Sequence, residues 1–318
     1  MNDRFMDNVC HTLVGAALAE AGLKRRTRYA SATLMIAANL PDIDVLSFIS
    51  GTPPVAFRRG WTHGIGAQLL LPVLFTGVLW LVGQRSTRES ADPRPLHAGW
   101  LLALSYVGVY SHVFLDYLNN YGVRLLTPFD WRWFYGDTLF IVDPWLWVVL
   151  GTGVWLARRR GMPALSRGAL LVAACYIAAL LMSARTARTV VAEQWSAAHG
   201  AAPLALMVGP VPISPFTREV IIDAGTHYER GTFSWPSSVT FNHAQIPKND
   251  KRPEVASARS ARNVRALLVW SRFPFWTLEP VAGGTRVTLG DARFMDRVGM
   301  FSASTVVATK VTESTTIQ

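Results

Sequence analysis

The segment GIGAQLLLPVLFTGVLWLVG, residues 64–83, contains no charged residue. A helix rises about 1.5 Å per residue, so about 20 residues are enough to cross a hydrocarbon core about 30 Å thick. This segment is the clearest membrane span in the sequence. It predicts an integral membrane protein, and the rest of the chain has to be arranged around it.

The composition of the whole chain agrees with a membrane protein. Half of the 318 residues are hydrophobic and only 16% are charged, which would be unusual for a wholly soluble protein. The apolar residues gather between Val9 and Met182, whereas the C-terminal part is mixed polar sequence with many Pro, Gly, Ser and Thr. We therefore expect a membrane-embedded domain at residues 1–184 and a β-rich extracytoplasmic domain at residues 185–318.

Further helices are predicted on both sides of the clearest span. Weaker spans are expected near 98–118, 139–157 and 168–183, and two more polar helices near 7–23 and 29–50. The predicted fold is thus mainly α, a polytopic membrane bundle of about six helices, followed by the β-rich soluble domain. The first helix lacks the basic start and cleavage site of a signal peptide, so we expect it to remain in the mature protein.

Three short basic loops set the expected orientation, because Lys and Arg collect on the cytoplasmic side of a membrane. These loops lie at 24–28, 84–97 and 158–167. Two predicted helices separate each loop from the next, so all three loops lie on the same side of the membrane. Both termini then lie outside the cytoplasm. The arginines behind the net charge of +10 serve topology and contact with the lipid bilayer, so nucleic acid is not an expected partner.

The two cysteines fall in different apolar helices. Cys10 and Cys175 show no spacing typical of a disulfide framework or a thiolate metal site. We interpret both as small packing residues.

Imidazole and carboxylate side chains collect at the outer ends of the predicted helices. In SHVFLDYL, His112 and Asp116 are four residues apart, which places them on one helix face with Cβ atoms about 5–6 Å apart. MDNVCHTL repeats this spacing with Asp7 and His11. Two such side chains suit one metal ion, although an isolated pair of this kind is as often only a hydrogen bond.

Two further segments supply donors at the same face. In NLPDIDVL, Pro41 breaks or kinks the helix before Asp42 and Asp44. RRGWTHGIG places His63 at a helix entrance. The predicted metal ligands are His11, Asp42, Asp44, His63, His112 and Asp116, and the catalytic candidates are Asp42, Asp44 and Asp116.

Four other polar residues are possible supporting groups around this site: Asp7, Asn39, Asp137 and Asp143. Asp137 and Asp143 flank the start of a predicted helix, so either could instead be a helix N-cap.

Imidazole and carboxylate donors without thiolate suit zinc, manganese or iron(II). There are enough donors for one or two ions, with zinc the first choice. A pair of ions could stabilise both the attacking and the leaving oxygen in a displacement at phosphorus. A lone histidine at a helix end is usually an ordinary interfacial residue, but the gathering of the whole set at one face favours a metal site.

Four segments, MDNVCHTLVGAALAEAGL, AANLPDIDVL, RRGWTHG and SHVFLDYLNNYGVRLLTPF, resemble the YdjM-like inner-membrane metal-dependent hydrolases over residues 3–160. The resemblance implies a hydrolase of the bacterial inner membrane with metal at the matching histidines and aspartates given above. Their order is also similar to that in zinc-dependent phospholipases C and related fungal nucleases. Unlike those proteins, the chain has no obvious later His-x-x-x-Glu pair, which argues against a three-zinc site unless Asp137 or Asp143 replaces part of it.

The C-terminal half reads as strands in SPFTREVIIDAGTHYERGTFSW and TRVTLGDARFM, after a last helix that we expect to end at Arg185 and Arg188. His227 and His243 could be ligands, but isolated histidines in strands are more often ordinary surface or core residues. The aromatic segment VWSRFPFWTLEP could contact the bilayer interface or cover the site, and a domain core is the favoured interpretation.

The predicted function is a membrane-bound metal-dependent hydrolase with its site on the periplasmic side, cleaving a phosphoester of a lipid or lipid-linked substrate with a metal-activated water. The alternative is a transporter or ion-handling protein that uses the same His/Asp cluster, which would place polar residues through the full bilayer depth. A third interpretation makes the metal purely structural.

Overall fold

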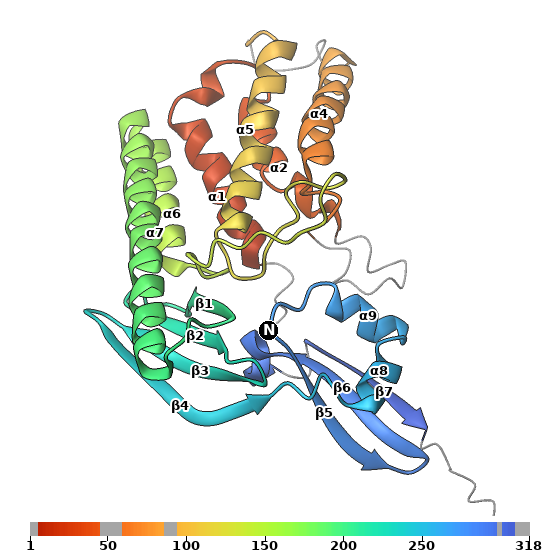
Figure 1. Ribbon diagram of the computed structural model, residues 1–318. Helices are drawn as coiled ribbons and strands as arrows, with labels where there is room; N and C mark the ends of the chain where they lie inside the picture. Colours follow the sequence, from red (N-terminus) through yellow and green to blue (C-terminus); the bar gives the residue numbers. More distant parts are fainter. Residues whose placement is uncertain (1–5, 45–58, 86–93, 298–300, 309–318) are drawn as a thin grey trace, which may run out of the picture.

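The computed structural model describes residues 6–44, 59–85, 94–297 and 301–308. Helices form one end of the molecule and two β-sheets form the other, with α7 running from the helical end onto the first sheet (Figure 1). The six α-helices described up to residue 199 are α1 (Met6–Glu20), α2 (Ala30–Ala37), α4 (Ile65–Arg85), α5 (Ala98–Tyr117), α6 (Pro144–Arg160) and α7 (Pro163–His199).

Three of these helices, α4, α5 and α7, are long and apolar enough to cross a membrane. The other three are shorter, with 15 residues in α1, 8 in α2 and 17 in α6. About six spans are therefore not established, although a helix lies at each predicted place. The expected helix at 29–50 differs most, because α2 ends at Ala37 and the chain continues as a turn and a 3-10 helix to Asp44. Pro41 explains this, since it lacks the N–H needed to continue the helix; residues 45–50 lie outside the described residues.

Glycines bring α2 into close contact with its two neighbours. A Cβ added at Gly15 of α1 would lie 2.7 Å from the Leu34 carbonyl oxygen, and one at Gly108 of α5 would lie 2.6 Å from the Ala37 Cβ. Small residues allow membrane helices to approach this closely. The packing places the end of α2, with Asp42 just beyond it, beside the middle of α5.

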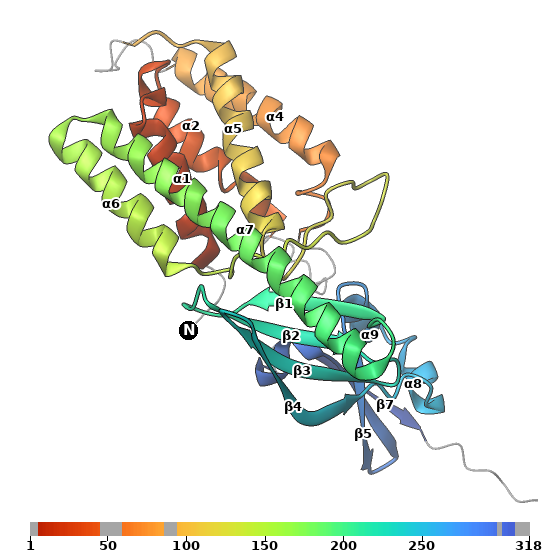
Figure 2. The same ribbon diagram turned by 60° about the vertical axis from the view of Figure 1, so that its left-hand side comes forward.

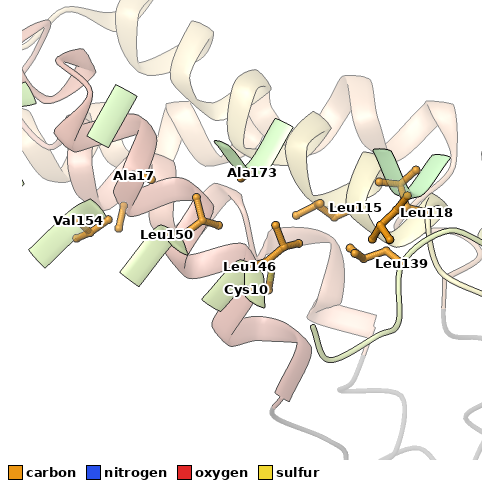
Figure 3. Close-up of a cluster of buried hydrophobic side chains, with 11 residues drawn as sticks. Cys10, Ala17, Leu115, Leu118, Leu139, Leu146, Leu150, Val154 and Ala173 are labelled. Atoms are coloured by element: carbon orange, nitrogen blue, oxygen red, sulfur yellow. The ribbon is translucent and has the colours of Figure 1, made fainter. Parts of the chain in front are cut away.

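A second contact layer joins α1, α5, α6 and α7 around a buried hydrophobic cluster (Figure 3). It contains Leu115 and Leu118 at the end of α5 and Leu146 and Leu150 of α6. Cys10 belongs to this cluster, as expected for a packing residue, whereas Cys175 is exposed.

Helix α7 extends well beyond its predicted end. It has 37 residues, a length of about 55 Å, and continues to His199 rather than stopping near Arg185 and Arg188. No glycine or proline follows Arg188 until Gly200, and the face formed by Ala187, Val191 and Trp195 is buried against the first sheet. The predicted domain boundary at 184/185 thus falls inside a continuous helix.

The C-terminal region contains two antiparallel sheets (Figure 2). The first has the order β1 (Ala205–Pro210), β2 (Thr217–Asp223), β3 (His227–Ser234), β4 (Ser238–Pro247), and the second has β5 (Pro274–Val281), β6 (Gly284–Asp291), β7 (Ser302–Ala308). Two short helices, α8 (Pro253–Ala258) and α9 (Arg262–Leu268), lie between the sheets in sequence. The aromatic segment predicted as domain core is buried at Trp270, Phe273 and Trp276.

The β-rich region is bound to the loop that follows α5. Arg293 donates to the Asn120 carbonyl oxygen at 2.7 Å, and the Trp270 indole donates to the Tyr121 carbonyl oxygen at 2.9 Å. Arg218 of β2 donates to the Leu180 carbonyl oxygen of α7 at 2.9 Å. Burial lowers the pKa of the Arg218 guanidinium to about 10, with the nearby Asp137 carboxylate opposing that shift. The two regions are thus joined directly below the end of α5.

Candidate metal centre

Four buried side chains from three separate segments meet at the end of the helical bundle that faces the sheets. Asp42 lies in the 3-10 helix after α2, His63 lies two residues before α4, and His112 and Asp116 lie near the end of α5. One donor atom from each residue lies within 4.8 Å of the others. All four residues are at most 6% exposed, so the cluster could hold a metal ion away from bulk water.

The imidazole of His112 is oriented by the backbone of the segment after α2. Its Nδ1 lies 2.8 Å from the Ala38 carbonyl oxygen. A carbonyl oxygen can only accept, so Nδ1 carries the proton and Nε2 carries the lone pair. That lone pair points to the centre of the cluster, where Nε2 lies 3.1 Å from His63 Nε2.

The imidazole of His63 is fixed in the same tautomer by a relay of two groups. Its Nδ1 lies 3.0 Å from the Thr62 hydroxyl, and that hydroxyl donates to Asp44 Oδ2 at 3.0 Å. Because the hydroxyl has a single proton, it must accept from Nδ1–H, which leaves the lone pair of His63 on Nε2. Two imidazole lone pairs therefore face each other, an arrangement that requires a cation or a proton between them.

The two aspartates complete a donor set of metal-site dimensions. Asp42 Oδ1 lies 3.9 and 3.8 Å from the Nε2 atoms of His63 and His112, and Asp116 Oδ2 lies 3.2 and 3.7 Å from the same atoms. Donors about 2.1 Å from a tetrahedral zinc ion lie about 3.4 Å from each other. The residues present therefore fit a divalent ion in both geometry and chemistry.

Arg59 is part of this centre, and the sequence analysis missed it. It is buried. Its Nε lies 3.0 Å from Asp116 Oδ2, and its Nη2 donates to Asp116 Oδ1 at 3.0 Å. Its Nη1 donates to Asn119 Oδ1 at 3.0 Å. Such a two-point pair fixes the plane of the carboxylate. A signal was present in RRGWTHG, because an arginine in a loop predicted outside the cytoplasm departs from the positive-inside rule.

The buried charges at the centre are unequal. Among the described residues at the centre, Asp42, Asp44 and Asp116 provide three carboxylates and Arg59 provides one guanidinium, so these four groups together carry two negative charges in excess. Buried charge is costly unless it is paired or coordinates a metal. A divalent cation would neutralise this excess.

Two predicted ligands lie beside the four-residue set rather than in it. The His11 ring stacks on the His112 ring with centroids 3.8 Å apart, and its Nε2 lies 3.5 Å from Asp116 Oδ1. Asp44 Oδ2 accepts hydrogen bonds from the Arg59 backbone N–H at 2.8 Å and from the Thr62 hydroxyl. Asp44 thus holds the segment that carries Arg59 and His63.

The predicted supporting residues have other partners. Asn39 Nδ2 donates to Thr12 Oγ1 at 2.9 Å and to the Met35 carbonyl oxygen at 2.8 Å. Asp143 caps α6 by accepting from the Leu146 N–H at 3.0 Å, which realises the N-cap alternative. Asp137 pairs with Arg272 Nη1, 2.9 Å from each carboxylate oxygen.

The remaining candidates lie apart from the cluster or outside the described side chains. His227 Nε2 is 3.3 Å from Glu229 Oε1 within β3. The side chains of Asp7 and His243 lie outside the described residues.

The family model described as YdjM inner membrane protein matches residues 6–187, a range that contains Arg59 and all four residues of the donor set. The chain is also similar to the "Uncharacterized protein YfhP" of Bacillus subtilis (strain 168), with 26% identity over 263 residues, which is 81% of this chain and 75% of that protein. No solved structure matches the chain.

Proposed function

The chain belongs to the YdjM inner membrane protein family, and from this membership and the buried His/Asp cluster we propose that it is a membrane-bound metal-dependent hydrolase. The substrate that we propose is a phosphoester of a lipid or lipid-linked molecule. The observation that carries the proposal is the pair of imidazole Nε2 atoms, 3.1 Å apart, beside two buried carboxylates.

The proposed topology is a six-helix, multi-pass arrangement in the bacterial inner membrane with the metal centre and the β-rich region on the periplasmic side. Its support is that residues of all three basic loops meet at one end of the bundle. Arg94 donates to the Lys24 carbonyl oxygen, Arg158 pairs with Glu20 at 2.8 Å, and Arg167 donates to the Ala21 carbonyl oxygen at 2.8 Å. The donor set lies at the other end, near the sheets, as expected if the basic end is cytoplasmic.

The ion would be held by Asp42, His63, His112 and Asp116. Zinc is the first choice of metal, and manganese and iron(II) are the alternatives. The four donors fit one ion, and a second ion would need further ligands such as His11 or Asp44. A divalent ion there supplies a Lewis acid for a phosphoryl oxygen and makes a water molecule acidic enough to react at neutral pH. Arg59 compensates the charge of Asp116 and orients its carboxylate, and the Ala38 carbonyl and Thr62 hydroxyl keep both imidazoles in the ligand tautomer.

Asp42 is the carboxylate that we assign to proton transfer. Both oxygens of Asp116 contact Arg59, and Asp44 Oδ2 already accepts two hydrogen bonds. Asp42 also lines a groove at the surface of the bundle, from which water and substrate would approach it. The Asp42 carboxylate oxygen that does not bind the ion would accept the proton from the attacking water.

The test is a panel of phosphodiesters and phospholipids incubated with the purified, zinc-loaded protein. We expect hydrolysis by the wild type and a loss of about 100-fold or more in His112→Ala. His97→Ala is the matched control, because His97 is exposed at the opposite end of α5. Metal-dependent ion flux in liposomes without hydrolysis of any phosphoester would contradict the proposal and favour transport.

A further inference from the structure

A groove of about 470 Å³ opens on the bundle surface between α1 and the segment that continues α2. Its apolar wall is formed by Met35, Ile36, Leu40 and Ile43, and Asp42 lies at the same wall. Since Asp42 is also one of the four donor residues, the groove and the metal centre share a residue. An occupant of the groove would therefore have one end at the metal centre.

The groove exists because α2 is short. Eight residues of helix rise only about 12 Å, which is less than half of a hydrocarbon core about 30 Å thick. After Ala37 the chain turns through a 3-10 helix that directs Asp42 inward, whereas Ile36 and Ile43 are each 47% exposed. Exposed aliphatic side chains of this kind are suited to contact with hydrocarbon rather than with water.

The chemistry of the lining favours a hydrocarbon chain as the occupant. Among the described residues that line the groove, Asp42 is the only charged one. Two of the polar side chains in the lining are hydrogen-bonded within the protein, since Asn39 Nδ2 donates to Thr12 Oγ1 and Thr12 Oγ1 donates to the Asn8 carbonyl oxygen at 2.7 Å. The volume lies within the range of about 300–1,000 Å³ typical of small-molecule sites.

We propose that this groove binds a single hydrocarbon chain of an amphiphilic phosphoester, which enters sideways from the bilayer and places its phosphoryl group at Asp42. The inference rests on the proposed hydrolase function and specifies its substrate class. The hydrocarbon chain lies along Ile36 and Ile43, and the head group lies at Asp42, the residue that the groove shares with the metal centre. Selectivity for a long chain is then a property of the groove and is separable from the chemistry.

The first test fills the groove by Ile36→Trp. The control is Val78→Trp on α4, another exposed apolar position (58% exposed) that does not line the groove. Each variant is assayed on two substrates with the same head group, a long-chain phospholipid and a short-chain water-soluble diester. We expect Ile36→Trp to lower kcat/KM for the long-chain substrate by roughly tenfold or more and to change that for the short-chain one by less than about twofold, with the metal content unchanged. Equal effects on both substrates, or none on either, would overturn the inference.

A second test does not depend on turnover. A non-hydrolysable long-chain alkyl phosphonate with a photoreactive group in its chain is cross-linked to the protein in detergent micelles, and the labelled peptides are identified by mass spectrometry. We expect labelling at residues 35–43 that excess unlabelled phosphonate competes away and that Ile36→Trp abolishes. Labelling spread over all exposed apolar helix faces, without competition, would contradict the groove. If the wild type hydrolyses neither substrate, the proposed hydrolase function is wrong. The cross-linking result alone then shows whether the groove binds a hydrocarbon chain.

Discussion

The Nε2 atoms of His63 and His112 lie 3.1 Å apart although the two residues are separated by 49 positions in the chain. Each ring has its Nδ1 engaged with an acceptor, the Thr62 hydroxyl for His63 and the Ala38 carbonyl oxygen for His112. The two lone pairs therefore converge on one point from different segments. The fold thus places a preformed pair of nitrogen donors inside a membrane protein.

The hydroxyl of Thr62 determines the tautomer of His63. In Thr62→Val the Nδ1–H loses its acceptor and Asp44 loses a donor, so Nε2 is no longer held as the ligand atom. We expect the affinity for zinc to fall by about 10–100-fold, the usual effect of removing a group that orients a metal ligand. Thr62→Ser keeps the hydroxyl and should bind zinc as the wild type does. Competition with a chromogenic chelator measures both affinities, and equal values for Thr62→Val and the wild type would refute this role.

Arg59 balances the buried charge of Asp116. Removing one partner of a buried ion pair costs about 3–5 kcal/mol, because the other charge stays buried without compensation. We therefore expect Arg59→Met to lower the free energy of unfolding by about this amount in the presence of a chelator. Added zinc should recover part of the loss, since a cation at the centre also compensates Asp116. Thermal unfolding in detergent, with and without zinc, measures how much zinc stabilises each protein. The stabilisation by zinc should be larger for Arg59→Met than for the wild type.

The close contact of α2 with α5 depends on Gly108. In Gly108→Ala the new methyl group would lie 2.6 Å from the Ala37 Cβ, so the helices must separate. We expect a loss of about 1–3 kcal/mol in stability together with weaker zinc binding, because Ala38 and Asp42 move with α2. At Gly77 of α4 an added Cβ meets no atom within 4 Å, so Gly77→Ala is the matched control and should leave both quantities near the wild-type values. Identical melting temperatures for the two variants would show that the contact is not tight.

The arrangement of the helices could be predicted from sequence where a simple physical rule acts alone. The uncharged run at 64–83 has the length and composition of a span, and α4 forms there. The break at Pro41 was also predictable, because proline cannot continue the hydrogen-bonded helix. The extension of α7 was not expected, because its outer part is a different kind of helix, with Ala187, Val191 and Trp195 packed on a sheet rather than in lipid.

The donor residues could be named from sequence, but their arrangement could not. Spacing places His112 and Asp116 on one face of one helix, whereas the meeting of Asp42 and His63 with that face depends on tertiary packing such as the Gly108 contact. For the same reason Arg59 was missed. The sequence also could not distinguish Asp44 and His11, which lie beside the set that could hold an ion, from the members of that set. Which partner a buried group takes is decided by distance in space.

A buried ion pair in the second sheet region predicts the acid sensitivity of the protein. Asp291 accepts two hydrogen bonds from the Arg293 guanidinium, both at 2.9 Å. Burial alone would raise the pKa of the Asp291 carboxyl, but the charge and hydrogen bonds of Arg293 outweigh burial and hold that pKa below its ordinary value. The contribution of Asp291 to stability is therefore complete above the ordinary aspartate pKa of about 3.9 and is lost as the pH falls through the lowered value.

The corresponding variant is Asp291→Asn, which leaves Arg293 without its carboxylate. We expect it to lose about 3–5 kcal/mol near neutral pH and to show a smaller further loss below about pH 4 than the wild type. Asp250→Asn, at an exposed position, serves as the control. Thermal unfolding of the full chain across this pH range checks both expectations, and a wild-type-like acid profile for Asp291→Asn would contradict them.

The most direct test of the metal centre is the metal content of the purified protein by elemental analysis, after exchange into metal-free buffer. We expect about one or two divalent ions per chain in the wild type and in His97→Ala, and near-complete loss of this metal in His112→Ala and His63→Ala. A wild-type protein that is folded but holds no metal even after incubation with zinc, manganese and iron(II), or a His112→Ala variant that keeps the full amount, would contradict this expectation.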